Sequence, residues 1–372
     1  LGGLTGIDGK PLFESGFIDY LRDLKFTCSV DAIPEGEIAY PNEPLMRVRG
    51  PLLQCQLVET ALLNIVNFQT LIATKAARVS AAAGDGEVLE FGLRRAQGVD
   101  GGLAASRAAY IGGCTGTSNV LAGKRFGIPV RGTHAHSWVM SFESEIGAFE
   151  SYADAMPNNC VFLVDTYDTL GGVEKAIRAG QRLRERGFEM VGIRLDSGDL
   201  AVLSIAARKM LDEAGFENAK IVASNDLDEH AVAQLKEAGA KIDVWGIGTK
   251  LVTAFDQPAL GGVYKLGALR RQDGEWEFKM KIGDAVKVSN PGILGVRRER
   301  DRDVLFHSED LDREDDLLRP LFRDGAQLGE DRPLAEVREF AVANWKNHGK
   351  RAVELDPNLA AMKQGLMERN RA

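Results

Sequence analysis

The segment Gly132 to Phe142 contains two of the five histidines in the chain, His134 and His136, separated by one residue. On a strand, side chains at i and i+2 point to one face, so both imidazoles could bind one metal ion if further Cys, His or carboxylate ligands joined them. They could instead be hydrogen-bonded structural imidazoles at a strand end. The third interpretation is a reactive nitrogen, acting as nucleophile or as acid and base, because imidazole titrates near neutral pH. This segment alone leaves all three open.

Polar turns follow a series of short apolar segments that are predicted to be strands. The clearest are DTYD after Val161 to Val164, DSGD after Met190 to Leu195, SNDLDE after Ile221 to Ala223, and GIGTK after Ile242 to Trp245. Helical patterns separate the first three turns from the strands that follow, and these strands recur about every 30 residues, the spacing of successive βα units in a parallel sheet or barrel. The expected helix N-caps are Asp168 with Thr169, Ser197 and Asp228.

In parallel α/β architectures the carboxyl ends of the strands form the ligand site, so these turns should converge on one mouth. The segment EFGLRRAQG and the histidine segment are expected to join them there. The candidate site residues are Phe91, Arg94, Arg95, Thr133, His134, His136, Ser137, Asp165, Asp168, Arg194, Asp196, Ser197, Gly198, Asp199, Ser224, Asn225, Asp226, Gly246, Gly248 and Thr249.

The GIGT turn can bring bare backbone N–H groups close to a phosphate, with Thr249 as an extra donor. The alternative for Gly246 and Gly248 is a tight turn with no ligand. Carboxylates beside hydroxyls, as at Asp165 and Asp196, suit a ribose diol or a phosphate-bound Mg²⁺. Helix capping is the simpler role of such residues.

Arg194 lies on an apolar strand, where an inward guanidinium must find an anionic ligand or a carboxylate. A structural pair with Asp196 or Asp199 is the alternative to a ligand. Phe91 could stack on a flat ring while one of the two arginines after Leu93 holds a phosphate. A core phenylalanine followed by two surface arginines is the alternative there.

The whole composition describes an ordinary globular protein. With 372 residues and 44% hydrophobic content the chain can bury a large core. A net charge of −8 offers no broad basic field for nucleic acid. The four cysteines are far apart in sequence without a CxxC pair, which disfavours structural zinc and suits free thiols in the cytoplasm. Polar residues interrupt the most apolar stretch, Leu57 to Ala77, so no membrane span is predicted.

Three regions are predicted along the chain. Residues 1–87 form the N-terminal part of a β-rich flanking domain plus a long buried helix, which covers Leu57 to Ala83. Residues 88–260 form an α/β-barrel catalytic domain. Residues 261–372 contribute returning β-strands and C-terminal helices.

Within the last region we expect a strand over Val286 to Val288. The charged stretches Arg297 to Asp303 and Glu309 to Asp316 are predicted to be solvated surface linkers.

Five segments appear in order through residues 90–251: EFGLRRAQG, GTHAHSWVMSF, RLDSGDL, SNDL and GIGTKL. Together they resemble the bacterial nicotinate phosphoribosyltransferases, type II enzymes related to the nicotinamide and quinolinate phosphoribosyltransferases. TALLNIVNFQTLIATKAAR and GGVYKL extend the resemblance over most of the chain. The fold that it implies is an irregular, incomplete parallel α/β barrel with a β-rich flanking domain formed from both chain ends.

The resemblance implies the first step of NAD salvage from nicotinate. Nicotinate and 5-phosphoribosyl 1-pyrophosphate would give nicotinate mononucleotide and pyrophosphate, with ATP hydrolysis coupled through a phosphohistidine. By motif, the phosphorylated residue is His136, with His134 as a support or phosphate contact. Mg²⁺ would be held through the substrate, with Asp165 or Asp196 as candidate ligands, and these two carboxylates would also stabilise positive charge at C1′.

Further roles follow from the related nicotinamide enzymes. Phe91 would stack on the pyridine, Arg194 would lie at the ring and its carboxylate, and Arg94 would hold phosphate. The ribose phosphate would be bound by Asn225, Asp226, Gly248 and Thr249. The nicotinamide enzymes carry an Asp on the strand before the histidine loop, whereas residues 115–119, TGTSN, have no carboxylate, which favours nicotinate as the substrate.

One departure from the family is visible. Its N-terminal TDxY segment, whose Tyr closes the pyridine site from the neighbouring subunit of a homodimer with shared active sites, has no match in the sequence. We therefore keep a truncated chain, a non-catalytic relative that binds the same ligands, and a nicotinamide-using enzyme as alternatives. An unrelated barrel enzyme acting on a sugar phosphate would share the Gly and Asp turns but has no need of GTHAHS or FGLRR.

Overall fold

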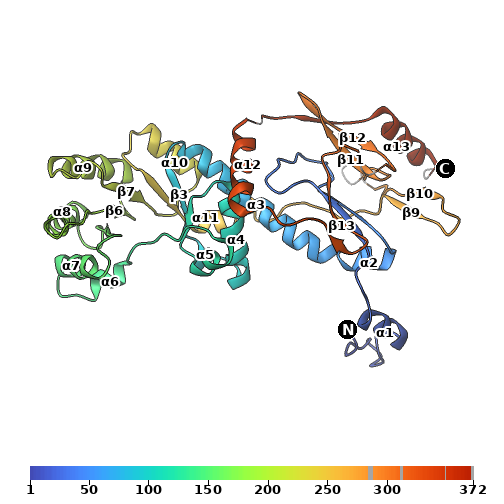
Figure 1. Ribbon diagram of the computed structural model, residues 1–372, viewed down its shortest axis with the longest axis horizontal. Helices are drawn as coiled ribbons and strands as arrows, with labels where there is room; N and C mark the ends of the chain where they lie inside the picture. Colours follow the sequence, from blue (N-terminus) through green and yellow to red (C-terminus); the bar gives the residue numbers. More distant parts are fainter. Residues whose placement is uncertain (284–287, 311–312, 348, 370–372) are drawn as a thin grey trace. The chain divides into compact units, whose positions relative to one another are not determined.

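The structure is a computed structural model that describes residues 1–283, 288–310, 313–347 and 349–369. The chain divides into two compact units (Figure 1). Unit 1 contains residues 1–63, 263–331 and 349–372, and unit 2 contains residues 64–262 and 332–348. No helix in the described part of the chain combines the length and hydropathy that a membrane crossing requires. Residues 284–287, which hold most of the strand predicted over Val286 to Val288, lie outside the described part.

Unit 2 is built on six parallel strands in the order β4-β3-β8-β7-β6-β5. Their bounds are β3 (Glu87–Glu90), β4 (Gly116–Thr117), β5 (Val161–Leu163), β6 (Gly192–Leu195), β7 (Lys220–Ala223) and β8 (Val244–Ile247). The last strand of the series, β8, pairs in parallel with the first, β3, as the first and last strands of an α/β barrel do. The sheet stays open, since no described pairing joins its edge strands β4 and β5. The predicted incomplete parallel α/β barrel is confirmed.

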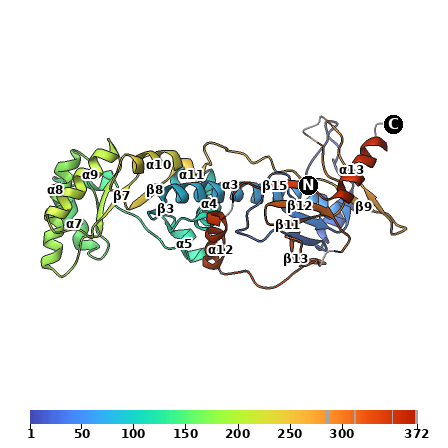
Figure 2. The same cartoon turned by 90° about the horizontal axis from the view of Figure 1, so that it is seen from above.

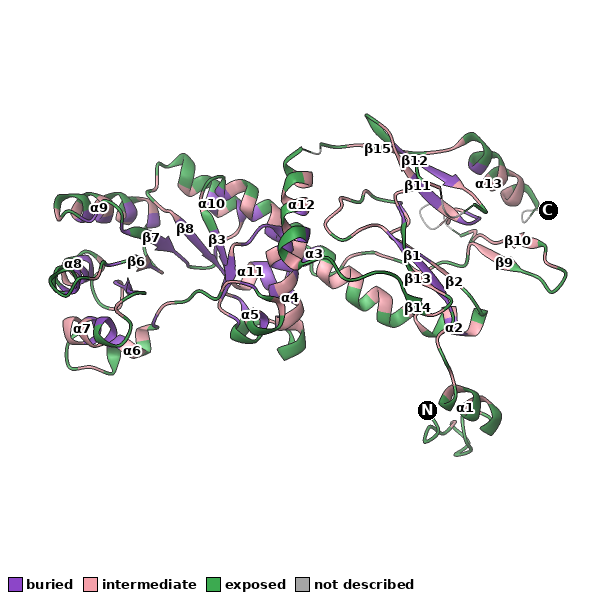
Figure 3. Ribbon diagram, viewed as in Figure 1, coloured by how far each residue is buried: buried purple, intermediate pink, exposed green. Residues whose placement is uncertain are grey.

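Helices connect and cover these strands. They are η1 (Leu93–Arg95), α4 (Gly98–Gly112), α5 (Val120–Phe126), α6 (His136–Met140), α7 (Glu145–Ala155), α8 (Thr169–Glu185), α9 (Leu200–Glu213), α10 (Glu229–Glu237), α11 (Thr249–Val252) and α12 (Leu334–Asn347). Helices α7, α8, α9 and α10 are neighbours in that order, and α9 contacts β6 and β7 (Figure 2). The strands are buried (Figure 3), as expected of a parallel sheet covered by helices.

The long apolar helix predicted over Leu57 to Ala83 is present with one break. Helix α2 (Leu52–Leu57) ends at Val58, and α3 (Glu59–Ala83) continues to Gly84. Gly84 has a φ of +63°, the left-handed conformation that commonly ends a helix. The part of α3 in unit 2 buries Leu71, Ile72 and other apolar side chains in the main core. The first half of α3, residues 59–70, holds no buried residue, so the prediction of a helix buried along its whole length is wrong there.

Unit 1 is rich in β-structure from both ends of the chain, as predicted. One antiparallel sheet has the order β14-β13-β1-β2, from β1 (Ser29–Ala32), β2 (Met46–Arg49), β13 (Arg319–Arg323) and β14 (Ala326–Gln327). A second sheet joins β11 (Leu294–Arg298), β12 (Arg302–His307) and β15 (Ala352–Leu355). The hairpin β9 (Ala268–Arg270) with β10 (Trp276–Phe278) and the helices α1 (Ser15–Arg22) and α13 (Pro357–Arg369) complete the unit.

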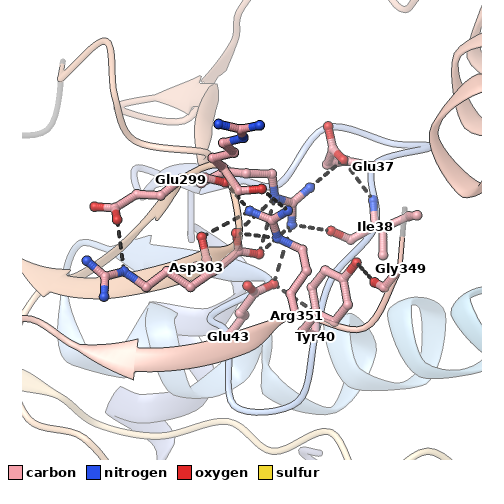
Figure 4. A network of polar contacts seen from close by, with 11 residues as sticks. Glu37, Ile38, Tyr40, Glu43, Glu299, Asp303, Gly349 and Arg351 are labelled. Atoms are coloured by element: carbon pink, nitrogen blue, oxygen red, sulfur yellow. Dashed lines mark hydrogen bonds and ion pairs between the residues drawn. The ribbon is translucent and has the colours of Figure 1, made fainter. Parts of the chain in front are cut away.

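The prediction of a solvated linker over Arg297 to Asp303 is wrong. These residues end β11 and begin β12, and Asp303 is fully buried between Arg298 and Arg351 (Figure 4). Asp316, at the end of the second predicted linker, is also buried and bonds Arg47 at 3.2 Å. In the second predicted linker Glu309, Asp310, Glu314 and Asp315 are exposed as predicted, and residues 311–312 lie outside the described part. Where charged side chains are buried, as at Asp303 and Asp316, partners distant in sequence neutralise them.

Glu43 lies in this network, and its carboxyl is expected to make the stability of unit 1 depend on pH. Burial, followed by sharing of a hydrogen bond with Asp303, raises the pKa of Glu43 to about 7. Because the folded protein holds the Glu43 proton more tightly than the unfolded chain, the folded state is stabilised at a pH below the ordinary pKa of 4.5. This stabilisation is lost as the pH rises from there through about 7. We expect the melting temperature to fall between pH 5 and pH 8 in the native chain and to vary much less in Glu43→Gln. The matched surface variant Glu330→Gln should keep the native slope; an unchanged slope in Glu43→Gln would refute this role.

Candidate active site

The turns after β5, β6 and β7 and the start of α6 bring the predicted catalytic residues together. His136 is the first residue of α6, and its side chain is 39% exposed. Its Nε2 lies 3.5 Å from Asp196 Oδ2 and 4.0 Å from Asp165 Oδ1, while Nδ1 lies 3.1 Å from Thr166 Oγ1. The partly exposed His136 imidazole therefore lies between the carboxylates of Asp165 and Asp196 on one side and the Thr166 hydroxyl on the other.

Asp165, two residues after β5, accepts hydrogen bonds through only one of its carboxylate oxygens. Oδ2 accepts hydrogen bonds from the Asp196 backbone N–H at 2.8 Å and the Ser197 hydroxyl at 2.6 Å. Oδ1 is buried and has no hydrogen-bond partner among the described residues. An unpaired buried carboxylate oxygen is costly, so its presence beside an open imidazole marks a position meant for a ligand.

Asp196, directly after β6, likewise uses one carboxylate oxygen for hydrogen bonds within the protein and turns the other toward His136. Oδ1 accepts from Arg194 at 2.8 Å and from the Ser224 hydroxyl, which leaves Oδ2 facing His136. Burial by itself would raise the pKa of Asp196, but the Ser224 hydrogen bond and the Arg194 guanidinium outweigh it, so the pKa is lowered. This carboxylate is therefore anionic at neutral pH.

Arg194 on β6 connects several elements of the site. Besides Asp196, its guanidinium donates to Ser224 Oγ at 2.8 Å and to Thr133 Oγ1 at 2.9 Å. The guanidinium carbon lies 5.9 Å from the centre of the Phe91 ring. The structural pair with Asp196 is thus present, and it fixes the cation beside an aromatic face.

The two histidines have different environments. His134 is 7% exposed, its Nε2 accepts from the Leu163 backbone N–H at 3.1 Å, and its ring lies against Tyr152. Burial lowers the pKa of His134 to about 4, so the imidazole is neutral. Its Nδ1 faces the Ala135 carbonyl at 3.5 Å, which favours a supporting role over a phosphate contact.

The turn after β7 has a strained backbone. Asn225 and Asp226 have φ values of 124° and 48°, which non-glycine residues adopt rarely and mostly at functional sites. Lys250 Nζ lies 2.9 Å from Asp228 Oδ2 and 3.8 Å from Asp226 Oδ2, and so joins this turn to the GIGTK turn after β8.

Strand β8 extends to Ile247, so Gly246 lies in the strand and not in the predicted turn, while Gly248 directly follows the strand. Both glycines make room for Phe91. A Cβ at Gly246 would lie 2.8 Å from the Phe91 ring, and one at Gly248 would lie 3.3 Å from the Phe91 carbonyl oxygen. The ring also packs against apolar side chains of the strands, including Leu89 and Val222. Phe91 therefore lies at the carboxyl end of β3, beside Arg194.

The remaining candidates are less engaged. Arg94, Arg95 and Ser137 are exposed, and in the described ranges their side chains have no polar partner. Asp168 caps α8 by accepting from the Gly171 N–H at 2.7 Å, as predicted.

The N-cap prediction for Asp228 is confirmed, since it accepts from the Ala231 N–H. The N-cap predicted at Ser197 is wrong. Gly198 takes a φ of +78°, and Asp199 two residues later caps α9 through Ala201 and Val202, which leaves the Ser197 hydroxyl for Asp165.

Thr166, Lys250 and Glu90 were not predicted. Thr166 and Lys250 lie inside the DTYD and GIGTK turns, so the turns themselves were the available signal. Glu90 is 1% exposed at the end of β3. It accepts from Ser106 at 2.8 Å, from Thr117 at 2.6 Å and from the Gly92 N–H, and so it anchors the loop that carries Phe91.

Replacing Glu90 by glutamine is expected to destabilise the protein and to loosen the Phe91 loop. The amide NH₂ would replace one carboxylate oxygen and so face either the Gly92 N–H or the Ser106 and Thr117 hydroxyls, at a cost of about 1–3 kcal/mol. Urea unfolding followed by fluorescence should show a lower midpoint than in the native chain. Glu87→Gln, on the exposed end of the same strand, is the matched control and should not move the midpoint; equal midpoints for both variants would contradict this role.

The site also fits a divalent cation bound together with a phosphorylated ligand. Mg²⁺ is commonly held by one or two carboxylates plus substrate phosphates. The two carboxylate oxygens without hydrogen bonds, Oδ1 of Asp165 and Oδ2 of Asp196, both face His136. No cluster of three or more Cys, His, Asp or Glu side chains suited to a metal occurs among the described residues, so the remaining ligands would come from substrate and water.

Comparison with known proteins agrees with this geometry. The nicotinate phosphoribosyltransferase N-terminal domain matches residues 7–67, and the nicotinate phosphoribosyltransferase family matches residues 87–297. The chain belongs to the nicotinate phosphoribosyltransferase family. The resemblance seen in the five ordered segments is therefore confirmed.

Relatives within the nicotinate phosphoribosyltransferase family differ in how much they share. The chain is 57% identical to the Bacillus subtilis enzyme over 269 residues, which are 72% of this chain and 54% of that protein. It is 43% identical to a Mycobacterium tuberculosis enzyme over 345 residues, 91% of this chain and 73% of that protein. The chain thus spans about half of the first relative and about three quarters of the second.

Two solved structures show the fold of the family. The human nicotinic acid phosphoribosyltransferase superposes with a TM-score of 0.79 at 30% identity, over 95% of this chain and 85% of that one. A nicotinate-nucleotide pyrophosphorylase from Pyrococcus furiosus superposes with a TM-score of 0.72 at 25% identity, over 89% of this chain and 84% of that one.

Proposed function

We propose that this protein is an enzyme that transfers the phosphoribosyl group of 5-phosphoribosyl 1-pyrophosphate to nicotinate, coupled to ATP hydrolysis through a phosphohistidine at His136. The products are nicotinate mononucleotide and pyrophosphate, and the reaction is the first step of NAD salvage from nicotinate. The observation that carries the proposal is the convergence of Asp165 and Asp196 on His136 within 4.0 Å at the carboxyl edge of the sheet. Family membership supplies the substrates.

Nicotinate is proposed to bind between Phe91 and Arg194. The aromatic face can stack on the pyridine, and the guanidinium beside it can attract the carboxylate. In the described residues around β4, the buried carboxylate is Glu90, and Ser106, Thr117 and Gly92 already donate to it. A nicotinamide NH₂ would therefore find no free acceptor there, which supports nicotinate.

The sugar is proposed to lie along the carboxyl edge. Asn225, Asp226 and the GIGT backbone would hold the ribose phosphate, and the positive φ values of Asn225 and Asp226 mark their turn as specialised. As the bond from C1′ to pyrophosphate breaks, positive charge develops at C1′ and the pyridine nitrogen forms the new bond. The anionic oxygens of Asp165 and Asp196 would stabilise that charge.

The carboxylates would also favour one imidazole nitrogen of His136 as the reacting atom. Two carboxylate oxygens near Nε2 favour the tautomer with its proton there, which leaves the lone pair on Nδ1 beside Thr166. Nδ1 would then attack the γ-phosphorus of ATP, forming the N–P bond as the bond to the bridging oxygen breaks and ADP leaves. Mg²⁺, when bound by Asp165 and Asp196, would neutralise phosphate charge.

Product analysis tests the proposal. Incubation with nicotinate, 5-phosphoribosyl 1-pyrophosphate, ATP and MgCl₂ should yield nicotinate mononucleotide by chromatography and mass spectrometry, and omission of ATP should lower the rate. Nicotinamide in place of nicotinate should give little product. Faster reaction with nicotinamide than with nicotinate would show that the protein is a nicotinamide-using enzyme. Ligand binding without product would show that it is a non-catalytic relative.

A homodimer with shared active sites in the cytoplasm completes the proposal and rests on the family resemblance. Light scattering after size-exclusion chromatography should give a mass of about twice the 40.4 kDa chain. A monomer that is fully active would refute the shared site.

A further inference from the structure

Two cysteines that are far apart in sequence lie side by side in unit 1. Cys28 Sγ and Cys55 Sγ are 3.9 Å apart, and both are free thiols. Cys28 directly precedes β1, while Cys55 lies in α2. A disulfide bond measures about 2.05 Å, so the sulfurs would each need to move by about 0.9 Å.

The surrounding contacts hold the two thiols together. Gln54, beside Cys55, is 6% exposed; its Oε1 accepts from the Thr27 N–H at 2.8 Å and its Nε2 donates to the Lys25 carbonyl at 3.1 Å. The Tyr264 hydroxyl bonds the Cys55 carbonyl at 2.9 Å. These contacts join the segment before β1 to α2 whether or not the sulfurs are bonded.

The close packing around Cys28 restricts where its sulfur can go. Cys28 is fully buried, and a Cβ at Gly50 would lie 2.5 Å from its Sγ. Cys55 is partly exposed and is therefore the sulfur that an oxidant can reach. Burial raises the pKa of both thiols, to about 12 for Cys28, where the neighbouring Cys55 adds to the effect; at Cys55 a hydrogen bond from Cys28 offsets part of it. The partial exposure of Cys55 therefore marks it as the thiol that reacts first.

We propose that Cys28 and Cys55 are an oxidative modification site, which a peroxide-class oxidant converts into an intramolecular disulfide. In the first step the Cys55 thiolate attacks one oxygen of hydrogen peroxide, the O–O bond breaks, and a sulfenic acid forms as water leaves. The Cys28 sulfur then attacks the Cys55 sulfur, the S–O bond breaks, and a second water leaves. In total two thiols and one peroxide give one disulfide and two waters.

The other two cysteines provide an internal comparison. Cys114 and Cys160 are buried, and among the described residues no thiol lies near either one. Burial raises the pKa of both, to about 11 for Cys160. They should remain reduced under conditions that oxidise the pair.

Intact mass spectrometry of the full chain treated with hydrogen peroxide tests the proposal. We expect a loss of about 2 Da, a fall in titratable thiols from the four of the reduced chain to two, and a Cys28–Cys55 cross-linked peptide, all reversed by dithiothreitol. Cys28→Ser and Cys55→Ser should abolish the mass loss, while Cys114→Ser should retain it.

Other outcomes would overturn this site. A gain of about 16 or 32 Da at Cys55 in the native chain would show oxidation without pairing. A cross-link to Cys114 or Cys160, disulfide-linked dimers on a non-reducing gel, or four unreacted thiols would also contradict it. If a serine variant fails to fold, peptide mapping of the peroxide-treated native chain gives the same decision, because it identifies directly which two cysteines are joined.

Discussion

Asp165→Asn is expected to lower the turnover of nicotinate mononucleotide formation by about 10²- to 10³-fold, with a smaller change in the Michaelis constants. The buried oxygen Oδ1 accepts no hydrogen bond in the described part of the chain and faces His136, so its charge is available for C1′ and for Mg²⁺. Asparagine keeps the shape and the bonds to Asp196 N–H and Ser197 on one oxygen but removes the charge. Steady-state kinetics at saturating substrates measure the effect.

Asp212→Asn is the matched control for this substitution. Asp212 lies on α9, about half exposed, and forms an i,i+4 pair with Arg208. Such pairs contribute about 0.3–0.5 kcal/mol, so turnover should stay within about twofold of the native value. If Asp165→Asn keeps the turnover of this control, Asp165 does not act on the reacting atoms.

His136→Ala is expected to remove the stimulation of the reaction by ATP completely. Without the imidazole no phosphoryl group can be held beside the carboxylates, so kcat/KM with ATP should fall to the value that the native chain shows without ATP. Adding ATP to the variant should change neither nicotinate mononucleotide formation nor ADP release. Parallel assays with and without ATP measure both.

His230→Ala serves as the control for His136→Ala. His230 is likewise near the start of a helix, α10, but is exposed and away from the two carboxylates. It should retain full ATP stimulation. A His136→Ala enzyme that still couples ADP release to product formation would refute the assigned role of His136.

The βα part of the fold was predictable because its signals are local. Apolar strands followed by Asp-bearing turns predicted β5, β6 and β7, and the cap at Asp168 marked the start of α8 correctly. The order of the turns also predicted that Asp165, Asp196 and Ser224 would share one edge. Their convergence follows from parallel topology alone.

Features made by long-range pairing were not predictable. β11 and β12 carry Arg298 and Asp303, which have the appearance of a charged linker until Glu37 and Arg351 are brought to them by the fold. Helix α4 is rich in Gly and Ala and is buried among several elements, so it lacks a clear amphipathic period.

Within the site, residue type alone could not separate neighbours. His134 and His136 are two residues apart, yet one is buried against Tyr152 and the other faces Asp196. Asp199, and not the expected Ser197, caps α9, and the Ser197 hydroxyl bonds Asp165 instead. Cap geometry depends on one φ angle, which the sequence pattern does not specify.

The most direct measurement is transfer of label from γ-labelled ATP to the protein, with the modified peptide identified at neutral to alkaline pH. We expect an acid-labile label on the Nδ1 nitrogen of His136. The label should be absent from His136→Ala, and it should be lost when nicotinate and 5-phosphoribosyl 1-pyrophosphate are added. Equal labelling of His136→Ala, label on another residue, or label that persists through turnover would contradict it.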